Sequence, residues 1–312
     1  MSNTQVHGFR FHALGSSGHI RVAGVAEDKA QAFVMASVRW LRDVESRLTR
    51  FSPHSLVGRL NVSAGSTGVK PDADLLAVLN AADIAHRITQ GRFDATALPL
   101  YKLWLDPERT QWPSDAELSA VRKLVNWSAV ERTPERVALP LKGMELDLGG
   151  VGKEWCVDRL IERAIKSAIE NCLIELGGDC RAIGAQPDRE GWWVLLPGPA
   201  SSILLKNEAL ATSGIGTRKR VLAGHSVSHL IDAQTGHPAP GVFQSVSVLG
   251  TDCLTAGIYA SDCCLLERAD KSLVAVRAAG EAAWCVTPSN QILADPRFLE
   301  RLHPVETKAG AA

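Results

Sequence analysis

The residues best suited to chemistry lie in a glycine-rich turn within residues 145–158, which read ELDLGGVGKEWCVD. Alternating residues ahead of Gly149 indicate the end of a strand, and apolar residues from Trp155 onward recur at helical spacing. Such a strand–turn–helix unit leaves backbone N–H groups and the positive end of a helix dipole facing outward, which favours an anion. Lys153 adds a full positive charge there. The turn predicts a phosphate site, although a tight turn that simply requires glycine explains the glycines equally well.

His229 is the candidate for proton transfer. It lies in residues 228–236, SHLIDAQTG, where strand alternation would place His229 and Ile231 on one face and Asp232 on the other. An imidazole titrates near neutral pH and can act as a general base. A single histidine is more often structural, so this residue becomes informative only together with other motifs.

Two more segments of small residues follow predicted strands. Residues 177–179 read GGD and residues 211–216 read ATSGIG. Glycine and small side chains let a backbone approach a ligand closely, and an ordinary loop remains an equally open interpretation. Each segment is weak evidence by itself.

Composition describes a globular chain without a polyanionic partner. The chain has 312 residues, of which 46% are hydrophobic and 22% charged, and its formal net charge is zero. Lysine and arginine are scattered, so we expect neither a nucleic acid nor an acidic membrane surface as partner. No apolar run approaches the roughly 18 residues of a membrane span. No stretch resembles a linker, so we expect one domain over residues 1–312.

The cysteines and the N-terminal residues predict a cytoplasmic protein. There are seven cysteines, which is an odd number, and two of them are adjacent. The chain has no CxxC pair, so neither a disulfide framework nor a zinc site is expected, and buried reduced thiols are the better explanation. The first residues lack an apolar core of signal-peptide length.

Hydrophobic periodicity predicts a mixture of helices and strands without strict alternation, which indicates the α+β class. We expect a hairpin at residues 6–25 and a frayed tail at residues 303–312. Helices are predicted at residues 28–48, 72–89, 154–170 and 256–266, with a short one from a Ser114–Glu117 capping box to residue 124. Strands are predicted at residues 172–176, 182–183, 192–196, 203–205, 209–212, 246–249 and 284–286.

The order of the motifs is more specific than any one of them. From about residue 10 to about residue 290, the chain resembles the ApbE family of FAD:protein FMN transferases. The resemblance rests on residues 46–51 (SRLTRF), 91–96 (GRFDAT), 147–153 (DLGGVGK), 176–179 (LGGD), 211–214 (ATSG) and 229–232 (HLID), with Leu14, Gly15, Ser55, Asn61, Thr235 and Gly236.

The resemblance implies both a fold and a reaction. The implied fold is ApbE-like and T-fold-like, a single unit of two intertwined α/β subdomains with mainly antiparallel sheets. The implied reaction cleaves FAD at its pyrophosphate, moves FMN onto a Thr or Ser hydroxyl of an acceptor flavoprotein, and releases AMP. In the family, Mg²⁺ neutralises the phosphates, which is the general logic of phosphoryl-type transfer.

The resemblance also implies roles for individual residues. His229 would be the catalytic base that takes the proton of the acceptor hydroxyl. The metal would be bound by the Gly150 carbonyl, Ser261 and, as a substitute ligand, Asp262. FAD would be bound by Leu14, Phe51, Asp94, Ala95, Thr96, Asp147, Lys153 and Ile231.

One metal-binding position departs from the family pattern. The family has an Ala-Asp pair with a Thr four residues after the Asp, and a gapless alignment places Gly257 and Ser261 at these two positions. Asp262 is one residue away, about 100° around a helix. Asp252 reaches the Asp position only with a gap in the alignment. A lost carboxylate weakens a Mg²⁺ site, so a FAD-binding protein without transfer stays open. A FAD hydrolase giving FMN and AMP and a phosphate-binding enzyme unrelated to flavin are two further alternatives.

Overall fold

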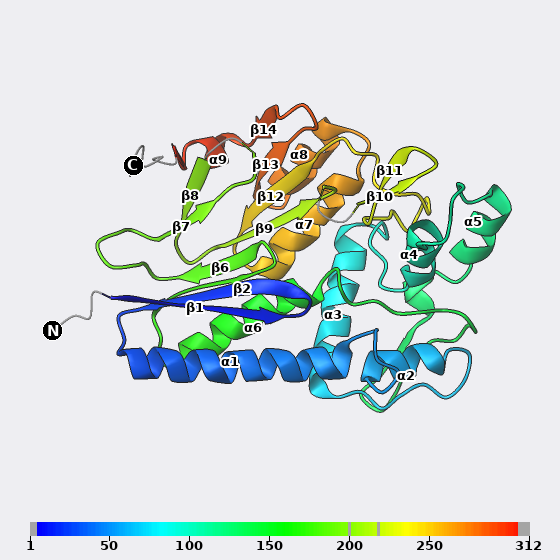
Figure 1. The fold of residues 1–312 in the computed structure, drawn as a ribbon, viewed down its shortest axis with the longest axis horizontal. Helices are drawn as coiled ribbons and strands as arrows, with labels where there is room; N and C mark the ends of the chain where they lie inside the picture. Colours follow the sequence, from blue (N-terminus) through cyan, green and yellow to red (C-terminus); the bar gives the residue numbers. More distant parts are fainter. Residues whose placement is uncertain (1–4, 199–200, 217–218, 305–312) are drawn as a thin grey trace.

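The structure is a computed structural model that describes residues 5–198, 201–216 and 219–304. Its largest element is an eight-stranded sheet in the order β1-β2-β5-β6-β9-β12-β13-β14 (Figure 1), in which every neighbouring pair is antiparallel. The strands are β1 (Val6–Ala13), β2 (Ser16–Ala23), β5 (Asn171–Leu176), β6 (Asp179–Ile183), β9 (Ala209–Gly214), β12 (Ser245–Gly250), β13 (Ala282–Val286) and β14 (Ile292–Ala294).

The sheet and the helices packed on it form two halves, and each half has two strands, two helices and two strands in chain order. The first half is β1, β2, α1 (Glu27–Leu48), α6 (Gly152–Lys166), β5 and β6. The second half is β9, β12, α7 (Cys253–Leu265), α8 (Ala269–Ala278), β13 and β14. The halves meet where β6 pairs with β9 (Figure 1). The mixed helices and mainly antiparallel strands confirm the predicted α+β class.

Smaller elements are inserted into this frame. Between α1 and α6 lie α2 (Leu56–Val62), α3 (Ala73–Ile88), α4 (Leu98–Leu105), α5 (Asp115–Arg122), η1 (Trp127–Ala129), β3 (Glu131–Arg132) and β4 (Val137–Ala138). Between β6 and β9 lie β7 (Trp192–Leu195) and β8 (Ser201–Leu205), which form a three-stranded sheet with β15 (Leu302–Pro304). The β10 (Lys219–Leu222) and β11 (His225–Ser228) hairpin separates β9 from β12, and α9 (Pro296–Leu299) follows β14.

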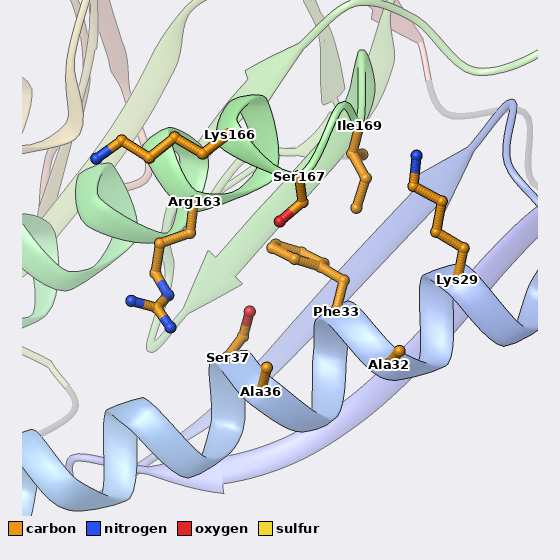
Figure 2. Close-up of a pocket in the computed structure, with 9 residues that line it drawn as sticks. All are labelled: Lys29, Ala32, Phe33, Ala36, Ser37, Arg163, Lys166, Ser167 and Ile169. Atoms are coloured by element: carbon orange, nitrogen blue, oxygen red, sulfur yellow. The ribbon is translucent and has the colours of Figure 1, made fainter.

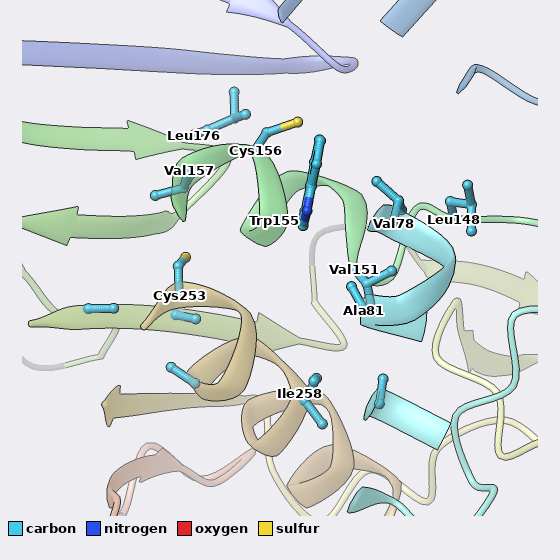
Figure 3. Packing of buried hydrophobic residues seen from close by; sticks show 14 of the residues in the cluster. Val78, Ala81, Leu148, Val151, Trp155, Cys156, Val157, Leu176, Cys253 and Ile258 are labelled. Atoms are coloured by element: carbon cyan, nitrogen blue, oxygen red, sulfur yellow. The ribbon is translucent and has the colours of Figure 1, made fainter. Parts of the chain in front are cut away.

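The main core lies between α3, α6 and α7 (Figure 3). Apolar residues at helical spacing on α6, such as Val157 and Ile161, are almost completely buried there. They share one cluster with Val78 and Ala81 of α3 and with Ile258 of α7. Helices α6 and α7 are therefore held against each other by packing.

Asp158 adds a polar link between α6 and α7. Its Oδ1 accepts hydrogen bonds from the Cys253 N–H at 2.9 Å and from Arg181 at 2.7 Å, and its Oδ2 accepts one from the Leu254 N–H at 3.0 Å. The first N–H groups of a helix have no partner inside that helix, so this carboxylate caps α7 from outside. Asp252 caps the same helix from within, because its Oδ1 accepts the Thr255 N–H at 2.8 Å.

Most of the predicted elements are confirmed with ends shifted by a few residues, including the Ser114–Glu117 capping box. Residues 145–148 differ, because they make only one bridge, between Glu145 and Ala97, instead of a strand. The reason is that Asn61 binds the backbone of Leu146 through both its amide atoms, at 2.7 and 3.0 Å. A side chain thereby replaces the strand partner.

Two other expectations are corrected. Residues 211–214 lie inside β9 and not in a turn, because β12 pairs with them along their whole length. The tail predicted to fray from residue 303 is ordered at its start, because His303 and Pro304 pair with β8 in β15. Residues 305–312 of that prediction lie outside the described residues.

None of the helices in residues 5–198, 201–216 and 219–304 combines the length and the hydrophobicity needed to cross a bilayer. The seven cysteines are all buried free thiols, as the sequence predicts.

Candidate active site

One cavity of about 450 Å³ is lined by the N-terminal end of α6, the last residues of β9, the C-terminal half of α7 and several loops. It brings together eight of the twelve predicted site residues. These are Asp94, Asp147, Gly150, Lys153, His229, Ile231, Ser261 and Asp262. Lys153 and His229 thus face the same cavity, although 76 positions separate residues 153 and 229 in the sequence.

The other four predicted FAD-binding residues do not line this cavity. Leu14 lies in the β1–β2 turn with φ of 52° and packs against the main core. Phe51 is 80% exposed, and the Arg50 guanidinium lies 4.2 Å from its ring centre. Ala95 and Thr96 are buried below the cavity wall. Since none of these four residues lines the cavity, their contacts with the nucleotide stay predictions from the resemblance.

Lys153 is held in place by two carboxylates. Its Nζ lies 2.6 Å from Asp179 Oδ2 and 3.3 Å from Glu154 Oε1. Burial opposes the charged form of Lys153, but these two carboxylates outweigh burial and raise its pKa, so the amine is charged at neutral pH. Asp179 follows Gly177 and Gly178, and Gly177 has a φ of 65°, in the left-handed region that favours glycine. The GGD turn therefore positions the lysine.

A second cation lies across the turn. Arg50 Nε is 3.0 Å from Asp147 Oδ2, and both residues line the cavity. Asp147 Oδ1 accepts the Gly149 N–H at 2.9 Å, which closes the glycine turn. This side of the cavity thus carries two cations, each paired with a carboxylate, and the N-terminus of α6, and all three can donate hydrogen bonds to an anion.

Asp94 organises the loop before α4. Its Oδ1 accepts hydrogen bonds from the Thr96 N–H and hydroxyl at 2.8 and 2.6 Å, and its Oδ2 accepts the Trp127 N–H at 3.0 Å. Thr96 is buried, and it fixes the conformation of the loop through its two hydrogen bonds to Asp94.

Asp262 does not face the cavity as a free carboxylate. Both of its oxygens accept hydrogen bonds from Arg92, at 2.7 and 2.8 Å. Burial raises the pKa of Asp262, and the Arg92 guanidinium opposes that rise. The residue predicted as a substitute metal ligand is thus already paired with a cation inside the protein.

The segment that carries His229 is a loop. Strand β11 ends at Ser228, and Ile231 makes only one isolated bridge, to Pro238. The expectation that His229 and Ile231 share a strand face is therefore wrong. The cause is the tight turn that follows, in which the Gly236 N–H donates to the Asp232 carbonyl at 2.7 Å.

The donors in the cavity fit a hard cation. Magnesium binds oxygen ligands, and the Gly150 residue and the hydroxyls of Ser213 and Ser261 all lie at the cavity, with the two hydroxyls 2.7 Å apart. Glu154 adds a carboxylate whose side chain is only 8% exposed, and its Oε2 has no hydrogen-bond partner among the described residues. Burial raises the pKa of Glu154, and Lys153 opposes that rise. In the described part of the chain, three or more His, Cys, Asp or Glu side chains nowhere gather as a metal cluster, so carbonyl and hydroxyl oxygens would complete any site.

Sequence reasoning missed Arg50, Arg92, Asp179 and Glu154 as site residues. The first three lie inside recognised motifs, but their partners are far away in the sequence. Glu154 had a usable signal, since it shares a helix face with Val157, Asp158 and the apolar Ile161. Acidic residues on the buried face of an amphipathic helix indicate a polar function.

A second cavity lies between α1 and α6 (Figure 2). Apolar side chains such as Phe33 and Ile169 form its floor, and Lys29, Arg163 and Lys166 lie at its rim. The Lys29 amine already donates to the Ala168 carbonyl at 3.0 Å. The lining of this second cavity includes neither a histidine nor a carboxylate, so it offers no such group for acid–base chemistry.

The fold has two similar halves, and the cavity is lined by residues from both of them. The chain belongs to the ApbE family, whose sequence model matches residues 14–284.

Curated relatives and solved structures agree with this assignment. The chain is 27% identical over 248 residues to the FAD:protein FMN transferase of Vibrio cholerae, covering 76% of this chain and 74% of that protein. It is 26% identical over 292 residues to the enzyme of that name from Treponema pallidum, covering 86% and 80%. The ApbE protein of Thermotoga maritima superposes with a TM-score of 0.85 at 25% identity, covering 95% of this chain and 99% of that one. The flavinyl transferase ApbE of Pseudomonas stutzeri has the same fold, with a TM-score of 0.85 at 21% identity and coverages of 96% and 98%.

Proposed function

We propose that this protein is a FAD:protein FMN transferase, which moves FMN from FAD onto a Thr or Ser hydroxyl of an acceptor protein and releases AMP. Family membership over residues 14–284 supports the reaction class. The structural observation that supports it most strongly is that Lys153 and His229 line the same cavity. A cation that can bind phosphate and a candidate base therefore lie at one site.

The proposed roles follow from charge and position. Lys153, Arg50 and the N-terminus of α6 bind the diphosphate of FAD, because all three lie at the cavity and can donate hydrogen bonds to phosphate oxygens. Ile231 and Leu98 provide apolar wall beside it. His229 takes the proton of the acceptor hydroxyl as that oxygen attacks the FMN phosphorus. The bond from phosphorus to the bridging oxygen breaks, and AMP leaves with the bonding electrons.

A divalent cation, Mg²⁺ by the family resemblance, would neutralise charge on the diphosphate when it is bound. The Gly150 carbonyl and the Ser261 hydroxyl are the oxygen donors proposed for it on this chain, and both residues line the cavity. Removal of divalent cations with EDTA is expected to abolish transfer, and added Mg²⁺ should restore it. Full activity in EDTA would contradict a metal-assisted reaction.

The test of the function uses the whole chain with FAD, Mg²⁺ and a fragment of an acceptor flavoprotein that carries a Ser/Thr flavinylation motif. Covalent flavin on the acceptor is measured by in-gel fluorescence, and AMP by chromatography. We expect equal amounts of both products. AMP without covalent flavin would instead identify a hydrolase, and tight FAD binding without either product would identify a binding protein.

The binding protein is the second candidate because Gly257 removes a carboxylate that the family pattern expects. We also propose that the protein forms one domain and works in the cytoplasm. The seven buried free thiols support a reducing compartment.

A further inference from the structure

Helices α6 and α7 approach each other in opposite directions beside the cavity. Asp158 of α6 binds the Cys253 and Leu254 N–H groups at the start of α7. Glu154 lies one turn before Asp158 in α6, and Gly257 lies one turn after Cys253 in α7. These two residues are in contact. One further turn along both helices are the glycine turn before α6 and Ser261 of α7, and both lie at the cavity.

Glu154 occupies the space that a side chain at position 257 would need. A Cβ added to Gly257 would lie 2.6 Å from Glu154 Cγ and 3.4 Å from both its carboxyl carbon and Oε1. A contact of 2.6 Å is too short for two carbon atoms, so any side chain at position 257 would force Glu154 to move from the place it occupies here. The glycine therefore makes room for Glu154.

The Glu154 carboxylate is only partly satisfied. Oε1 has Lys153 Nζ at 3.3 Å, while Oε2 is buried and has no hydrogen-bond partner within the described residues. Buried carboxylate oxygens are normally paired, because burial of an unpaired charge is costly. A cation bound at the cavity would supply the missing partner.

We propose that Glu154, which lies on α6, supplies the metal-binding carboxylate that position 257 of α7 lacks. This inference rests on the proposed function, since the metal serves the bound FAD. The Ser261 hydroxyl, the Gly150 carbonyl and the diphosphate oxygens would complete an oxygen set of the kind that Mg²⁺ prefers. The metal site would thereby keep one carboxylate ligand, supplied from α6 in place of α7.

The other acidic candidates are already occupied. Both oxygens of Asp262 are hydrogen-bonded to Arg92. Asp252 caps the far end of α7, and it does not line the cavity. Asp179 binds Lys153 with Oδ2 and the Thr212 N–H with Oδ1. Glu154 is the carboxylate among these with an oxygen to spare.

The first experiment measures Mn²⁺ affinity by electron paramagnetic resonance on the FAD-saturated protein without acceptor. Glu154→Gln is expected to weaken Mn²⁺ binding by about tenfold or more, since it removes one charged ligand. Glu162→Gln is the matched control, because Glu162 lies on the same helix and pairs with Arg159 away from the cavity. The control should stay within about twofold of wild type. Wild-type affinity in Glu154→Gln, or loss of Mn²⁺ binding in Asp262→Asn alone, would overturn the proposal.

The second experiment moves the carboxylate between the helices. Glu154→Ala should weaken Mn²⁺ binding. The double variant Glu154→Ala/Gly257→Asp should bind Mn²⁺ at least about fivefold more tightly than Glu154→Ala, because α7 then supplies the carboxylate. Gly257→Asp alone should bring no gain and a lower melting temperature, since Glu154 is still present. A double variant that binds Mn²⁺ no better than Glu154→Ala, while folded by circular dichroism, would refute the exchange.

The two hypotheses can fail separately. FAD affinity in metal-free buffer, measured by flavin fluorescence, tests the flavin site without the metal. A protein that binds FAD and Mn²⁺ through Glu154 but transfers no flavin would contradict the proposed function alone. A protein that transfers flavin with full Mn²⁺ affinity in Glu154→Gln would contradict this inference alone.

Discussion

Lys153 illustrates how single residues make this cavity. Its charged form would be unfavourable in a buried position without Glu154 and Asp179, and the side chains of these two acids are only 8% and 3% exposed. The three residues form one electrostatic unit, so removal of the cation would leave two buried carboxylates without their partner.

We predict that Lys153→Met lowers the free energy of unfolding by about 3–5 kcal/mol and also weakens FAD binding, because buried charges lose their counter-ion. Urea denaturation and flavin fluorescence measure the two effects. Lys166→Met, at an exposed position of the same helix, is the control and should change stability by less than about 0.5 kcal/mol. Unchanged stability in Lys153→Met would mean that the carboxylates are protonated or bound elsewhere.

His229 gives a second prediction at the level of one residue. We expect His229→Asn to slow flavin transfer by about 10²–10⁴-fold, the usual contribution of a general base. FAD affinity should change by less than about threefold, because the variant removes a proton acceptor and keeps the cationic side of the cavity. His225→Asn, on the exposed end of β11, is the matched control. Equal losses in both variants would indicate a structural effect of the loop.

At the level of elements, the position of α7 relative to α6 decides the geometry of the candidate metal site. Three contacts set that position: the apolar packing around Val157 and Ile258, the cap that Asp158 gives to α7, and the fit of Glu154 against Gly257. The first two are distant from the cavity, yet they determine how close the donors on the two helices come.

We predict that Asp158→Ala lowers the free energy of unfolding by about 2–4 kcal/mol, because it leaves buried N–H groups of α7 and the Arg181 guanidinium without their acceptor. Mn²⁺ affinity should fall as well, since α7 loses one of the three contacts that set its position relative to α6. Urea unfolding and the Mn²⁺ titration measure these effects. Asp115→Ala, in the exposed first turn of α5, should stay within about 0.5 kcal/mol of wild type. A stable variant with wild-type metal affinity would show that apolar packing alone positions α7.

At the level of the molecule, the cavity lies where the two halves meet. The β6–β9 contact consists of two residue pairs, Cys180–Leu210 and Arg181–Ala209, so the sheet is narrow at its centre. The cavity is lined by residues of α6 and of the β5–β6 turn from the first half and by residues of β9 and α7 from the second. A dinucleotide bound in the cavity would therefore contact both halves.

We predict a single unfolding transition whose midpoint rises with FAD. At about one hundred times the dissociation constant, FAD should add about 2.7 kcal/mol to the free energy of unfolding. Differential scanning calorimetry measures the shift, and agreement between calorimetric and van't Hoff enthalpies tests for a single transition. Adenosine, which lacks the diphosphate, is the control and should give a much smaller shift. Two transitions, with FAD acting on only one, would show that the ligand contacts a single half.

Local sequence determined much of this protein. Caps such as Ser114 with Glu117, the helices of residues 73–88 and 152–166, and the hairpin of β1 and β2 follow from patterns within a few residues. The order of the motifs along the chain predicted the family. The caps, helices and hairpin depend on backbone conformation and short-range hydrogen bonds, which neighbouring residues set.

Only the tertiary structure decided which side chains reach the cavity and which acids are already paired. Arg92 and Asp262 are 170 positions apart in the chain, and no local pattern reveals that they bind each other. In the same way, the sequence alone indicates that Gly257 has lost a metal-binding carboxylate, whereas the structure places Glu154 in the space that the glycine leaves. Long-range pairing depends on how helices pack, and packing is a property of the folded chain as a whole.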